Sequence, residues 1–484
     1  MLLNEGTYGH IYDMKNGTVR KQYKNDINGI PADMLREVAT LKRIDSPYVI
    51  QLLHVGDNFI ILPFYSYNLN QVFKNLIPYN KKNIFKCICL GLYDLHSIGI
   101  VHCDIKPGNV MFKDENRAVL IDTGFSKIFE SNRHYDIRSP RIATLYYRAP
   151  EIILEEKYSF EVDVWAAGCI LAEMYTGSYL FKIDNETDLL EYQCYLMGTP
   201  TYHENFELDF QSGVFKDDFK IYGQDVSDLI GGMLNTDYKE RLSIAQVLNA
   251  NYFQEHLKFQ DERRNYDDYL NDYDVGFTLI DSSEKLLEMR KILLLWLISI
   301  INYYNLSDST YFRTVMLLDR IIIDGKMRID ENNFQLIGMA CIFLAGKYEM
   351  VDCLSITEVL SVCDYNKGEL LEMEKIVFEN LNYDICQPTL YNYLCLYVHD
   401  LAMSKKQILT LLKYFYICSV ENFYVWPYPI LSIVCSYIIL GKDVGIENVT
   451  EEEREDLLLC DSSIRNWVLQ LDGEDYQPLR EKFS

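Results

Sequence analysis

Apolar and polar residues follow two different patterns in the first half of the chain. Residues 1–62 alternate between apolar and polar positions around glycine-containing turns, which predicts short strands. One helix interrupts these strands, because apolar residues recur at helical spacing at Met34, Leu35, Val38, Leu41 and Ile44. From 65 to 253 the pattern is mostly helical, with a loop-rich stretch from about 100 to 150.

The second half of the chain has a different pattern. Residues 254–280 are polar and lack apolar periodicity, so we expect a linker there, with a short helix at Tyr266–Leu270. From 284 to 470 one helical pattern follows another, and this change marks a domain boundary. The first of these helices, 289–301, is apolar nearly all round, and spacing alone favours a plain core helix over a partner-binding one.

Composition narrows the class of protein. The 484 residues are too many for one core, and 49% hydrophobic with 24% charged residues is ordinary for a globular protein. The net charge of -25 argues against nucleic acid and anionic membranes as direct partners. Thirteen scattered cysteines without a CxxC motif predict buried thiols in a reducing compartment. With no signal-peptide pattern and no apolar stretch long enough to span a bilayer, we expect an intracellular protein, cytoplasmic or nuclear and not secreted.

An ordered set of residues in the first half suits phosphoryl transfer. Gly6 and Gly9 would let the backbone approach phosphates closely, although glycines in a turn are a weak signal alone. The run HCDIKPGN at 102–109 is followed by Asp122-Thr123-Gly124 and by Ala149-Pro150-Glu151. Phosphoryl transfer needs a carboxylate that accepts the hydroxyl proton, metal ligands beside the phosphates, and cations that balance the developing charge. The chain supplies these residue types, in order, as Asp104, Lys106, Asn109 and Asp122.

These motifs resemble the signature set of the protein kinases. The resemblance implies that Asp104 is the catalytic base, and that Lys106 steadies the γ-phosphate and marks serine/threonine specificity. It implies ATP and Mg²⁺ as cofactors, with the metal held by Asn109 and Asp122. Lys21 would pair the ATP phosphates, with Glu37 as its partner on the helix. Lys24 is a rival for Lys21, although the spacing to the next helix favours Lys21.

The resemblance also implies an ATP site in the first 65 residues. Leu62 stands where the family has its gatekeeper, and residues 63–65 where it has the adenine-binding hinge. The whole implied site comprises Asn4, Glu5, Gly6, Gly9, Ile11, Val19, Lys21, Leu62, Phe64 and Tyr65.

Further runs resemble the cyclin-dependent kinases in particular. The helix GIPADMLREVATLKRI around Glu37 is similar to their PSTAIRE helix, and 143–154, 158–177 and 197–201 also match. The match at Ala143–Arg148 implies a preference for proline after the target serine or threonine. Glu151 and Arg241 would form the structural ion pair of the larger lobe.

Some positions depart from the family pattern or imply regulation. Asn4 replaces the first loop glycine, Thr123 the Phe of DFG, and Cys103 the Arg of HRD. We predict that Thr7 and Tyr8 are inhibitory phosphosites, because a phosphate there would add negative charge beside that of ATP, and the alternative is that both are ordinary loop residues. The resemblance makes Ser139 the activating phosphosite, surrounded by Arg36, Cys103 and Lys127. A thiol and a lysine bind phosphate less well than two arginines, so we expect Ser139→Ala to lower activity less than about tenfold.

The second half resembles the cyclins. Residues 317–323, 334–349 and 370–389 are similar to the cyclin box, and 391–470 more faintly to a second cyclin repeat. Lys347 and Glu374 match cyclin positions that contact the kinase helix and its neighbouring loop. The segment from 289 resembles the cyclin docking-patch helix for short basic-hydrophobic motifs, with the patch implied at Met289, Ile292, Leu293, Trp296 and Gln335.

The expected architecture is multidomain, an α+β bilobal protein-kinase fold followed by an all-α cyclin fold. We expect a kinase domain at 1–253 (small lobe 1–64, large lobe 65–253), a linker at 254–280, a first cyclin box at 281–388, a second cyclin-like repeat at 389–470 and a C-terminal tail at 471–484. A kinase and a cyclin in one chain also resemble proteins of some large DNA viruses.

The implied function is phosphorylation of serine or threonine in protein substrates by a kinase that its own cyclin-like half activates. That half would dock within the chain or on a second molecule. The alternative is a pseudokinase or decoy that captures cell-cycle partners, and the retained catalytic set favours activity.

Overall fold

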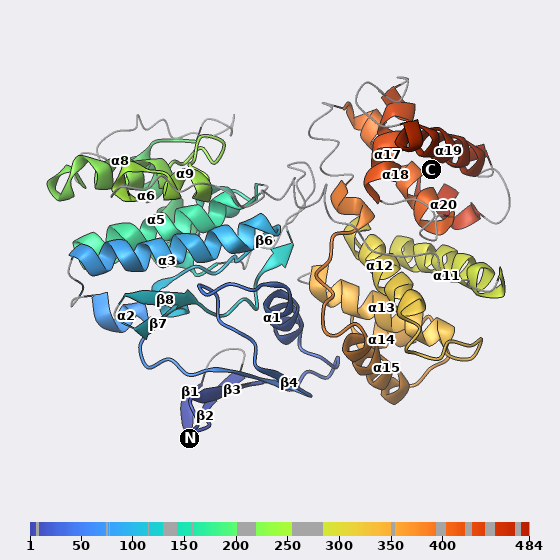
Figure 1. Ribbon diagram of the computed structural model, residues 1–484, viewed down its shortest axis with the longest axis horizontal. Helices are drawn as coiled ribbons and strands as arrows, with labels where there is room; N and C mark the ends of the chain where they lie inside the picture. The colour runs from blue at the N-terminus through green and yellow to red at the C-terminus, as the bar shows by residue number, and fades with distance from the viewer. Residues whose placement is uncertain are drawn as a thin grey trace. The chain divides into compact units, whose positions relative to one another are not determined.

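The computed structural model describes residues 1–5, 9–73, 76, 78–114, 116–128, 143–156, 158–200, 219–253, 284–349, 354–393, 403–421, 428–440, 451–469 and 476–483. These residues form two compact units (Figure 1). Unit 1 contains residues 1–24, 33–128 and 143–253 of the described part. Unit 2 contains the helices from 284 onward and also the short segment Asn25–Ala32, which we call the β3–α1 segment.

Unit 1 begins with a five-stranded antiparallel sheet, as the alternating pattern predicts. Its strands are β1 (Leu2–Glu5), β2 (Gly9–Asp13), β3 (Thr18–Tyr23), β4 (His54–Gly56) and β5 (Phe59–Pro63), in the order β1-β2-β3-β5-β4. In this register Lys21 of β3 lies between Ile11 of β2 and Ile60 of β5. Helix α1 (Ala32–Arg43) follows β3 in the chain and buries Leu35, Val38 and Glu37.

The rest of unit 1 is mostly helical. Its helices are α2 (Leu69–Val72), α3 (Pro78–Ser97), α4 (Pro150–Ile153), α5 (Glu161–Thr176), α6 (Glu186–Met197), α8 (Gln224–Met233) and α9 (Ile244–Leu248), with short 3-10 turns η2 (Pro107–Asn109), η3 (Leu145–Tyr147), η4 (Phe219–Tyr222) and η5 (Asn251–Phe253). Helix α5 forms the centre of this core, with Trp165 fully buried and stacked on Phe181. The ion pair expected between Arg241 and Glu151 is present and buried, with Nη1 2.6 Å from Oε1.

Two small sheets hold the loops that carry the kinase-like motifs. Strand β6 (Ile100–Val101) pairs with β9 (Lys127–Ile128), and β7 (Val110–Asp114) pairs with β8 (Arg117–Leu120). The 102–109 loop therefore runs from β6 to β7, and Asp122 comes directly after β8. The two predicted metal ligands thus lie at the same end of the β7–β8 pair, Asn109 just before β7 and Asp122 two residues after the end of β8.

Unit 2 is helical from residue 284 onward in its described part. Its helices are α11 (Glu284–Tyr303), α12 (Asp308–Asp324), α13 (Phe334–Glu349), α14 (Ile356–Leu360), α15 (Lys367–Asn380), α17 (Lys405–Glu421), α18 (Tyr428–Leu440), α19 (Glu451–Leu469) and α20 (Gln477–Lys482). Helix α13 is buried along most of its length and packs against α12 and α15. Local signals define the ends: Asn366 and Glu369 form a capping box at the start of α15, and Gly325 follows α12 with a φ of 60°.

The last described segment belongs to the core of unit 2. Helix α20 packs against α11, and Leu479 is fully buried. The Tyr476 hydroxyl lies 3.0 Å from Lys291 Nζ on α11. The expected linker at 254–280, with the helix at Tyr266–Leu270, lies outside the described residues. The domain boundaries themselves remain a prediction.

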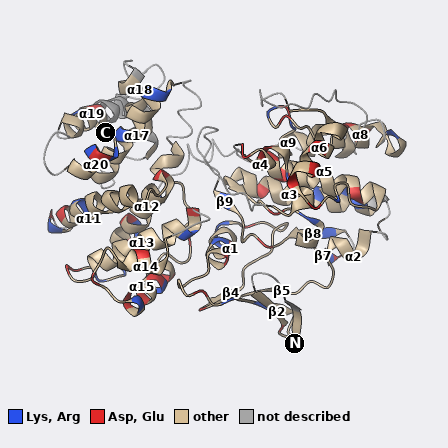
Figure 2. Cartoon of the chain, turned by 180° about the vertical axis from the view of Figure 1, so that it is seen from behind, with Lys and Arg blue, Asp and Glu red and all other residues tan. Residues whose placement is uncertain are grey.

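Charged residues of both signs are interspersed along the helices of each unit (Figure 2). Among the described cysteines, ten are buried and Cys363 is half-buried, and none is in a disulfide. None of the described helices combines the length and the apolar character that crossing a bilayer requires.

Candidate active site

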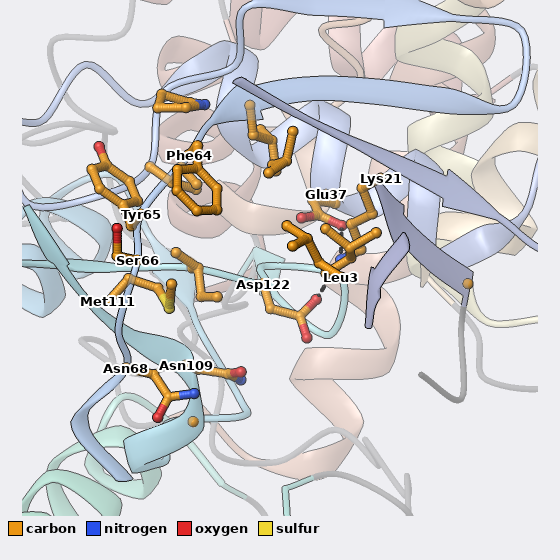
Figure 3. Close-up of a pocket in the computed structure, with 18 of the residues that line it drawn as sticks. Leu3, Lys21, Glu37, Phe64, Tyr65, Ser66, Asn68, Asn109, Met111 and Asp122 are labelled. Carbon is orange, nitrogen blue, oxygen red and sulfur yellow. Dashed lines mark hydrogen bonds and ion pairs between the residues drawn. The ribbon is translucent and has the colours of Figure 1, made fainter. Parts of the chain in front are cut away.

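A cleft of about 660 Å³ opens in unit 1 between the five-stranded sheet and the β7–β8 framework (Figure 3). Of the predicted nucleotide-site residues, it is lined by Gly9, Ile11, Val19, Lys21, Leu62, Phe64 and Tyr65, together with Glu37, Asn109 and Asp122. The predicted Gly6 lies outside the described residues, and Asn4 and Glu5 are described only as backbone in β1. The structure therefore brings together, in one cleft, residues that are up to about a hundred positions apart.

Sequence reasoning missed part of this lining. The additional residues are Leu3, Ile50, Pro63, Ser66, Asn68, Gln71, Gly108, Met111 and Ile121. Met111 of β7 is two positions after Asn109, and Ile121 directly precedes Asp122 after β8. Because side chains alternate along a strand, the sequence could have indicated that these two residues line the cleft. Asn68 and Gln71 belong to the start of α2, and nothing in their local pattern points to a cleft.

One cation and two carboxylates meet at the back of the cleft. Lys21 Nζ lies 2.6 Å from Glu37 Oε2 and 2.7 Å from Asp122 Oδ1 (Figure 3). The Tyr23 hydroxyl also donates to Glu37 Oε2, at 2.5 Å. Lys24 is exposed and Lys21 makes these contacts, so the geometry favours Lys21 over its rival.

Burial and charge pull the pKa values of this cluster in opposite directions. Burial alone would lower the pKa of Lys21, but Asp122 and Glu37 outweigh it and raise that pKa far above its ordinary value. Burial alone would raise the pKa of Asp122, but the Lys21 ammonium holds it below its ordinary value. For Glu37 burial outweighs Lys21, and its pKa lies above its ordinary value. Lys21 and Asp122 are therefore both charged at neutral pH.

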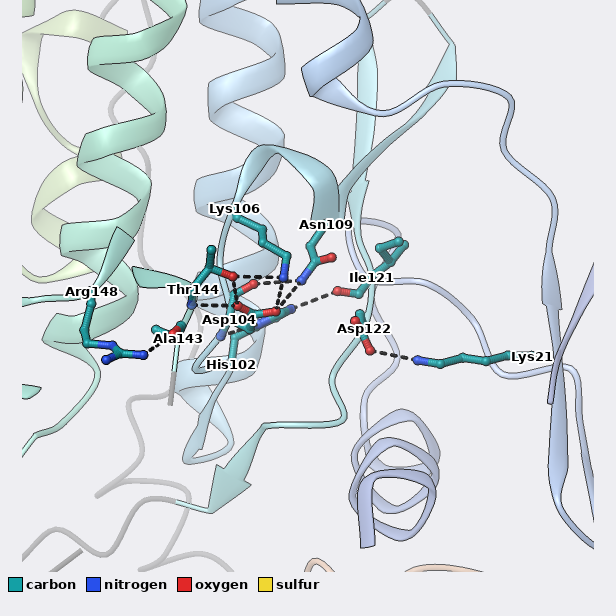
Figure 4. A network of polar contacts seen from close by, with 10 residues as sticks. All are labelled: Lys21, His102, Asp104, Lys106, Asn109, Ile121, Asp122, Ala143, Thr144 and Arg148. Carbon is teal, nitrogen blue, oxygen red and sulfur yellow. Dashed lines mark hydrogen bonds and ion pairs between the residues drawn. The ribbon is translucent and has the colours of Figure 1, made fainter. Parts of the chain in front are cut away.

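Asp104 lies in a dense network of donors (Figure 4). Its Oδ2 accepts from Lys106 Nζ at 2.7 Å and from Asn109 Nδ2 at 3.0 Å. Its Oδ1 accepts from the backbone N–H of Thr144 at 3.2 Å and from the Thr144 hydroxyl at 2.9 Å. Asp104 is only 3% exposed, so these four donors fix the direction of both carboxylate oxygens. Thr144 lies within residues 143–154, which resemble the cyclin-dependent kinases, but the sequence alone assigned no role to Thr144.

The backbone at His102 and Cys103 is bound by the carboxylate of Asp163. Asp163 of α5 accepts from the backbone N–H groups of His102 and Cys103, at 2.8 and 2.9 Å. Cys103 has a φ of 65° and is buried, with its thiol against the Val101 carbonyl. Burial and Asp163 raise the pKa of this thiol, while Lys127 and Arg36 lie close enough to oppose them. Cys103, Arg36 and Lys127 are thus neighbours, whereas Ser139, Thr7 and Tyr8 lie outside the described residues.

The predicted docking patch in unit 2 is only partly accessible. Ile292 is 62% exposed, Gln335 is exposed, and Met289 and Trp296 are half-buried. Leu293 is 6% exposed and lies so close to Gly338 of α13 that a Cβ there would overlap it. Leu293 therefore belongs to the core, because one face of α11 packs on α13. The accessible part of the patch is formed by the other four residues.

Lys347 and Glu374, the predicted contact residues, form a buried ion pair in unit 2. Lys347 Nζ also donates to the backbone carbonyl of Asn28, at 2.6 Å. Glu374 Oε2 accepts from the backbone N–H of Ile30, at 3.3 Å. The Asn28 side chain, which sequence reasoning did not single out, accepts from the N–H of Ile356 at the start of α14, at 3.0 Å. Both predicted residues thus bind the backbone of the β3–α1 segment.

Comparison with known proteins agrees with this fold. The family described as "Protein kinase domain" matches residues 2–253, and "Cyclin, N-terminal domain" matches 243–386. The chain belongs to the protein kinase family. Its kinase domain is related to the cyclin-dependent kinases, which are serine/threonine kinases, and a cyclin N-terminal domain follows it in the same chain.

Individual relatives each match about half of the chain. "Cell division control protein 2 homolog 3" of Trypanosoma brucei brucei is 32% identical over 52% of this chain and 90% of its own length. "Probable CTD kinase subunit alpha homolog" of Encephalitozoon cuniculi is 27% identical over 52% of this chain and 83% of its own length. The solved yeast RNA Pol II CTD kinase complex CTDK-1 has one chain that is 23% identical, with a TM-score of 0.46, over 55% of this chain and 97% of its own. A likeness at that level supports no conclusion about function.

Proposed function

We propose that this protein is an active kinase that transfers the γ-phosphate of ATP to serine or threonine followed by proline, and that its own cyclin half activates it. The observation that carries the proposal is the double contact of Lys21 with Glu37 and Asp122 in a cleft that is also lined by Asn109, which donates a hydrogen bond to Asp104. A decoy without catalysis has no need for a buried cation bound to two carboxylates, since burying such charges is costly.

The chain's own residues divide the chemistry among them. Asp104 would accept the proton of the substrate hydroxyl, with its orientation held by Thr144 and Asn109. Lys106, which bonds both Asp104 and Thr144, would stabilise charge on the transferred phosphoryl group. Lys21 would bind the other phosphates of ATP. Each of these side chains is preorganised by partners within unit 1.

The residues present fit a magnesium ion. Asn109 uses its amide nitrogen to donate to Asp104, so its amide oxygen stays available, and Asp122 is ionised. Oxygen ligands of this kind suit Mg²⁺, with ATP phosphates as the remaining ligands. A bound Mg²⁺ would neutralise charge on the β- and γ-phosphates. Asn109 and Asp122 would hold it.

The proline preference has support in the backbone before Thr144. Ala143 has a φ of 64°, and its carbonyl accepts from Arg148 Nη2 at 2.9 Å (Figure 4). That carbonyl is therefore occupied by the protein itself. Proline has no backbone N–H to pair, so a proline after the target residue loses nothing at this position.

Support for activation by the cyclin half comes from the β3–α1 segment. Its backbone is bound in unit 2 by Lys347 and Glu374, and it ends at Ala32, the first residue of α1. Glu37 follows five residues later and must face Lys21 for the ion pair to form. Holding the segment would therefore restrict where the helix that carries Glu37 can begin.

Gly29 offers a selective test of this idea. It has a φ of 94°, and a Cβ at this position would overlap Glu374 Oε2 and Leu371 Cδ2 of unit 2. Gly17, in the turn before β3, has a φ of 81° with nothing near enough for a Cβ to touch. Gly29→Ala therefore adds strain and a clash with the cyclin unit, whereas Gly17→Ala adds strain alone.

The experiment compares both variants in the full chain with Mg-ATP and a Ser-Pro peptide. We expect Gly29→Ala to lower kcat/KM at least about tenfold and Gly17→Ala to lower it about twofold or less, since about 1.4 kcal/mol corresponds to a factor of ten. Equal losses in the two variants would contradict activation through this segment. No phosphate transfer by the unchanged chain would instead favour the pseudokinase.

A further inference from the structure

Two side chains of the segment that follows Ala143 are held by the start of α6. The Tyr146 hydroxyl donates to Asp184 Oδ1 at 2.6 Å, just before α6 begins. Arg148 Nη1 forms an ion pair with Glu186, the first residue of α6. The spacing matches, because Tyr146 and Arg148 are two residues apart and so are Asp184 and Glu186. This segment is thus clamped to one helix end at two points.

The guanidinium of Arg148 connects this helix end to the Ala143 carbonyl. Nη1 binds Glu186, Nη2 donates to Ala143 O, and the buried Nε has no hydrogen-bond partner. The Arg148 backbone is fixed separately, since its carbonyl accepts from Gln193 Nε2 of α6 at 2.8 Å. Among the described residues, Glu186 therefore supplies the side-chain acceptor that holds the guanidinium in this orientation.

Ala143 lies where the backbone of a substrate has to pass. The next residue, Thr144, donates to Asp104 through both its N–H and its hydroxyl. A substrate hydroxyl that reaches Asp104 therefore brings its flanking peptide groups beside Ala143. The N–H that follows the target residue would need an acceptor there, because an amide removed from water without a partner costs about 1–3 kcal/mol.

We propose that Glu186 is a specificity-determining positioning residue, which keeps Arg148 on the Ala143 carbonyl and so selects substrates with a tertiary amide after the serine or threonine. This inference rests on the proposed function and names the residue that enforces its substrate class. In Glu186→Gln, a neutral amide oxygen replaces the carboxylate as the acceptor for Arg148, so the guanidinium is held less firmly against the Ala143 carbonyl. That carbonyl then becomes free to accept a substrate N–H. Secondary amides such as Ser-Ala would then be used more readily.

The position of Glu186 makes it suitable for substitution. Its side chain is 50% exposed, so removing its charge leaves the core intact. Asn185 caps α6 by accepting from the N–H of Asp188 at 2.8 Å, so the helix start does not depend on Glu186. Glu191, exposed on the same helix, provides a matched control with the same change of charge.

The experiment measures kcat/KM of the full chain for three peptides that differ only after the target serine: Pro, Ala and N-methylalanine. For the unchanged protein we expect Pro and N-methylalanine to be used alike and both to be preferred over Ala, since neither has an N–H. In Glu186→Gln we expect the Pro/Ala ratio to fall at least about fivefold, which corresponds to about 1 kcal/mol. Glu191→Gln should keep the ratio of the unchanged protein.

The outcomes separate this inference from the proposed function. An unchanged Pro/Ala ratio in Glu186→Gln, with normal turnover of the Pro peptide, overturns the inference alone. So does rejection of N-methylalanine by the unchanged protein, because the proline ring would then be what is recognised. Absence of phosphate transfer with every peptide overturns the proposed function. If Glu186→Gln melts at a lower temperature than Glu191→Gln, Glu186→Ala and Glu191→Ala are compared in their place, and an equal Pro/Ala ratio in these two variants overturns the inference.

Discussion

Single residues of the candidate active site act through the partners that hold them. Lys21 stays charged while buried because Glu37 and Asp122 surround it, and Asp104 is fixed by donors from two loops. A substitution at one of these positions therefore also changes the residues that depend on it. Predictions at this scale need a control that carries the same chemical change at an exposed site.

Asp122→Asn should lower phosphate transfer at least about 100-fold, because it removes a charged metal ligand and one of the two carboxylate partners of Lys21. Asp114→Asn is the control, since Asp114 is an exposed residue at the end of β7 that pairs with Arg117. Initial rates with Mg-ATP and a Ser-Pro peptide measure both variants. Turnover of Asp122→Asn within tenfold of the unchanged protein would contradict the assigned role.

Glu173 of α5 predicts a pH dependence of stability. Burial raises its pKa to about 7, although the Tyr147 hydroxyl and the Leu180 N–H favour its ionised form. The folded state therefore binds more protons than the unfolded state between about pH 4.5 and pH 7, and the free energy of unfolding contributed by Glu173 decreases as the pH rises through this window.

Glu173→Gln should remove this decrease, because an amide does not titrate. We expect the variant to gain on the order of 1–3 kcal/mol relative to the unchanged protein between pH 5 and pH 7.5. Urea unfolding at the two pH values measures it, with Glu191→Gln as the exposed control. The same pH slope in all three proteins would show that Glu173 titrates normally.

At the scale of elements, α1 is joined to the Asp122 loop by hydroxyl groups. Thr40 of α1 and Ser126 are both fully buried, with Oγ1 and Oγ 2.7 Å apart, and Ser126 Oγ donates to the Thr123 carbonyl at 2.5 Å. Gly124 lies against Asp33 at the start of the same helix. A polar bridge therefore connects the helix that carries Glu37 with the loop that carries Asp122, beside the position where Thr123 replaces the aromatic residue of related kinases.

A double-mutant cycle tests whether this bridge supports catalysis. Ser126→Ala and Thr40→Val should each lower kcat/KM about three- to thirtyfold, and the double variant should lose little more than one single variant, since both remove the same hydrogen bond. Thr176→Val is the control, because the Thr176 hydroxyl bonds the backbone groups of Ala172 and Ser178 at the end of α5. Fully additive losses would mean that the two hydroxyls do not act together.

At the scale of the whole molecule, the β3–α1 segment joins two compact units in an uncommon way. It belongs by sequence to the first half of the chain, yet its contacts place it in the compact unit of the cyclin helices. An isolated 1–253 fragment would keep Lys21 and Glu37 but lose Lys347 and Glu374. The position of α1 would then depend on unit 1 alone.

Residues 1–253 should therefore be much less active than the full chain, by at least about tenfold, and adding residues 280–484 should restore activity. Restoration should depend on concentration, because tethering makes the encounter intramolecular in the full chain. Steady-state kinetics over a titration of the second fragment measures it, with Lys347→Ala in that fragment as the control that should fail to restore. Equal activity of 1–253 and the full chain would contradict activation by the cyclin half.

Much of the fold followed from the sequence because its signals are local. Alternation predicts the strands that became β1 to β5, and helical spacing predicts α1 and the helices of unit 2 up to α19, whereas α20 lies in the segment predicted as a tail. The five-residue spacing from Asp104 to Asn109 and the later run Asp122-Thr123-Gly124 carry the family resemblance without any tertiary information. Leu293 was predicted to belong to the exposed docking patch, whereas it is buried against α13. Helical spacing alone cannot distinguish a core face from an exposed face, because that depends on where the neighbouring helix packs.

The sequence by itself determined the class of this protein, the order of its two parts and which charged residues are the candidates for catalysis, because residue type and spacing can be read along the chain. The tertiary structure alone decided which distant groups meet: Thr144 with Asp104 across 40 residues, Thr40 with Ser126 across 86, and Asn28 with Ile356 across 328. These partners are ordinary polar residues with no local pattern. Only the packing of the folded chain brings each pair within hydrogen-bond distance.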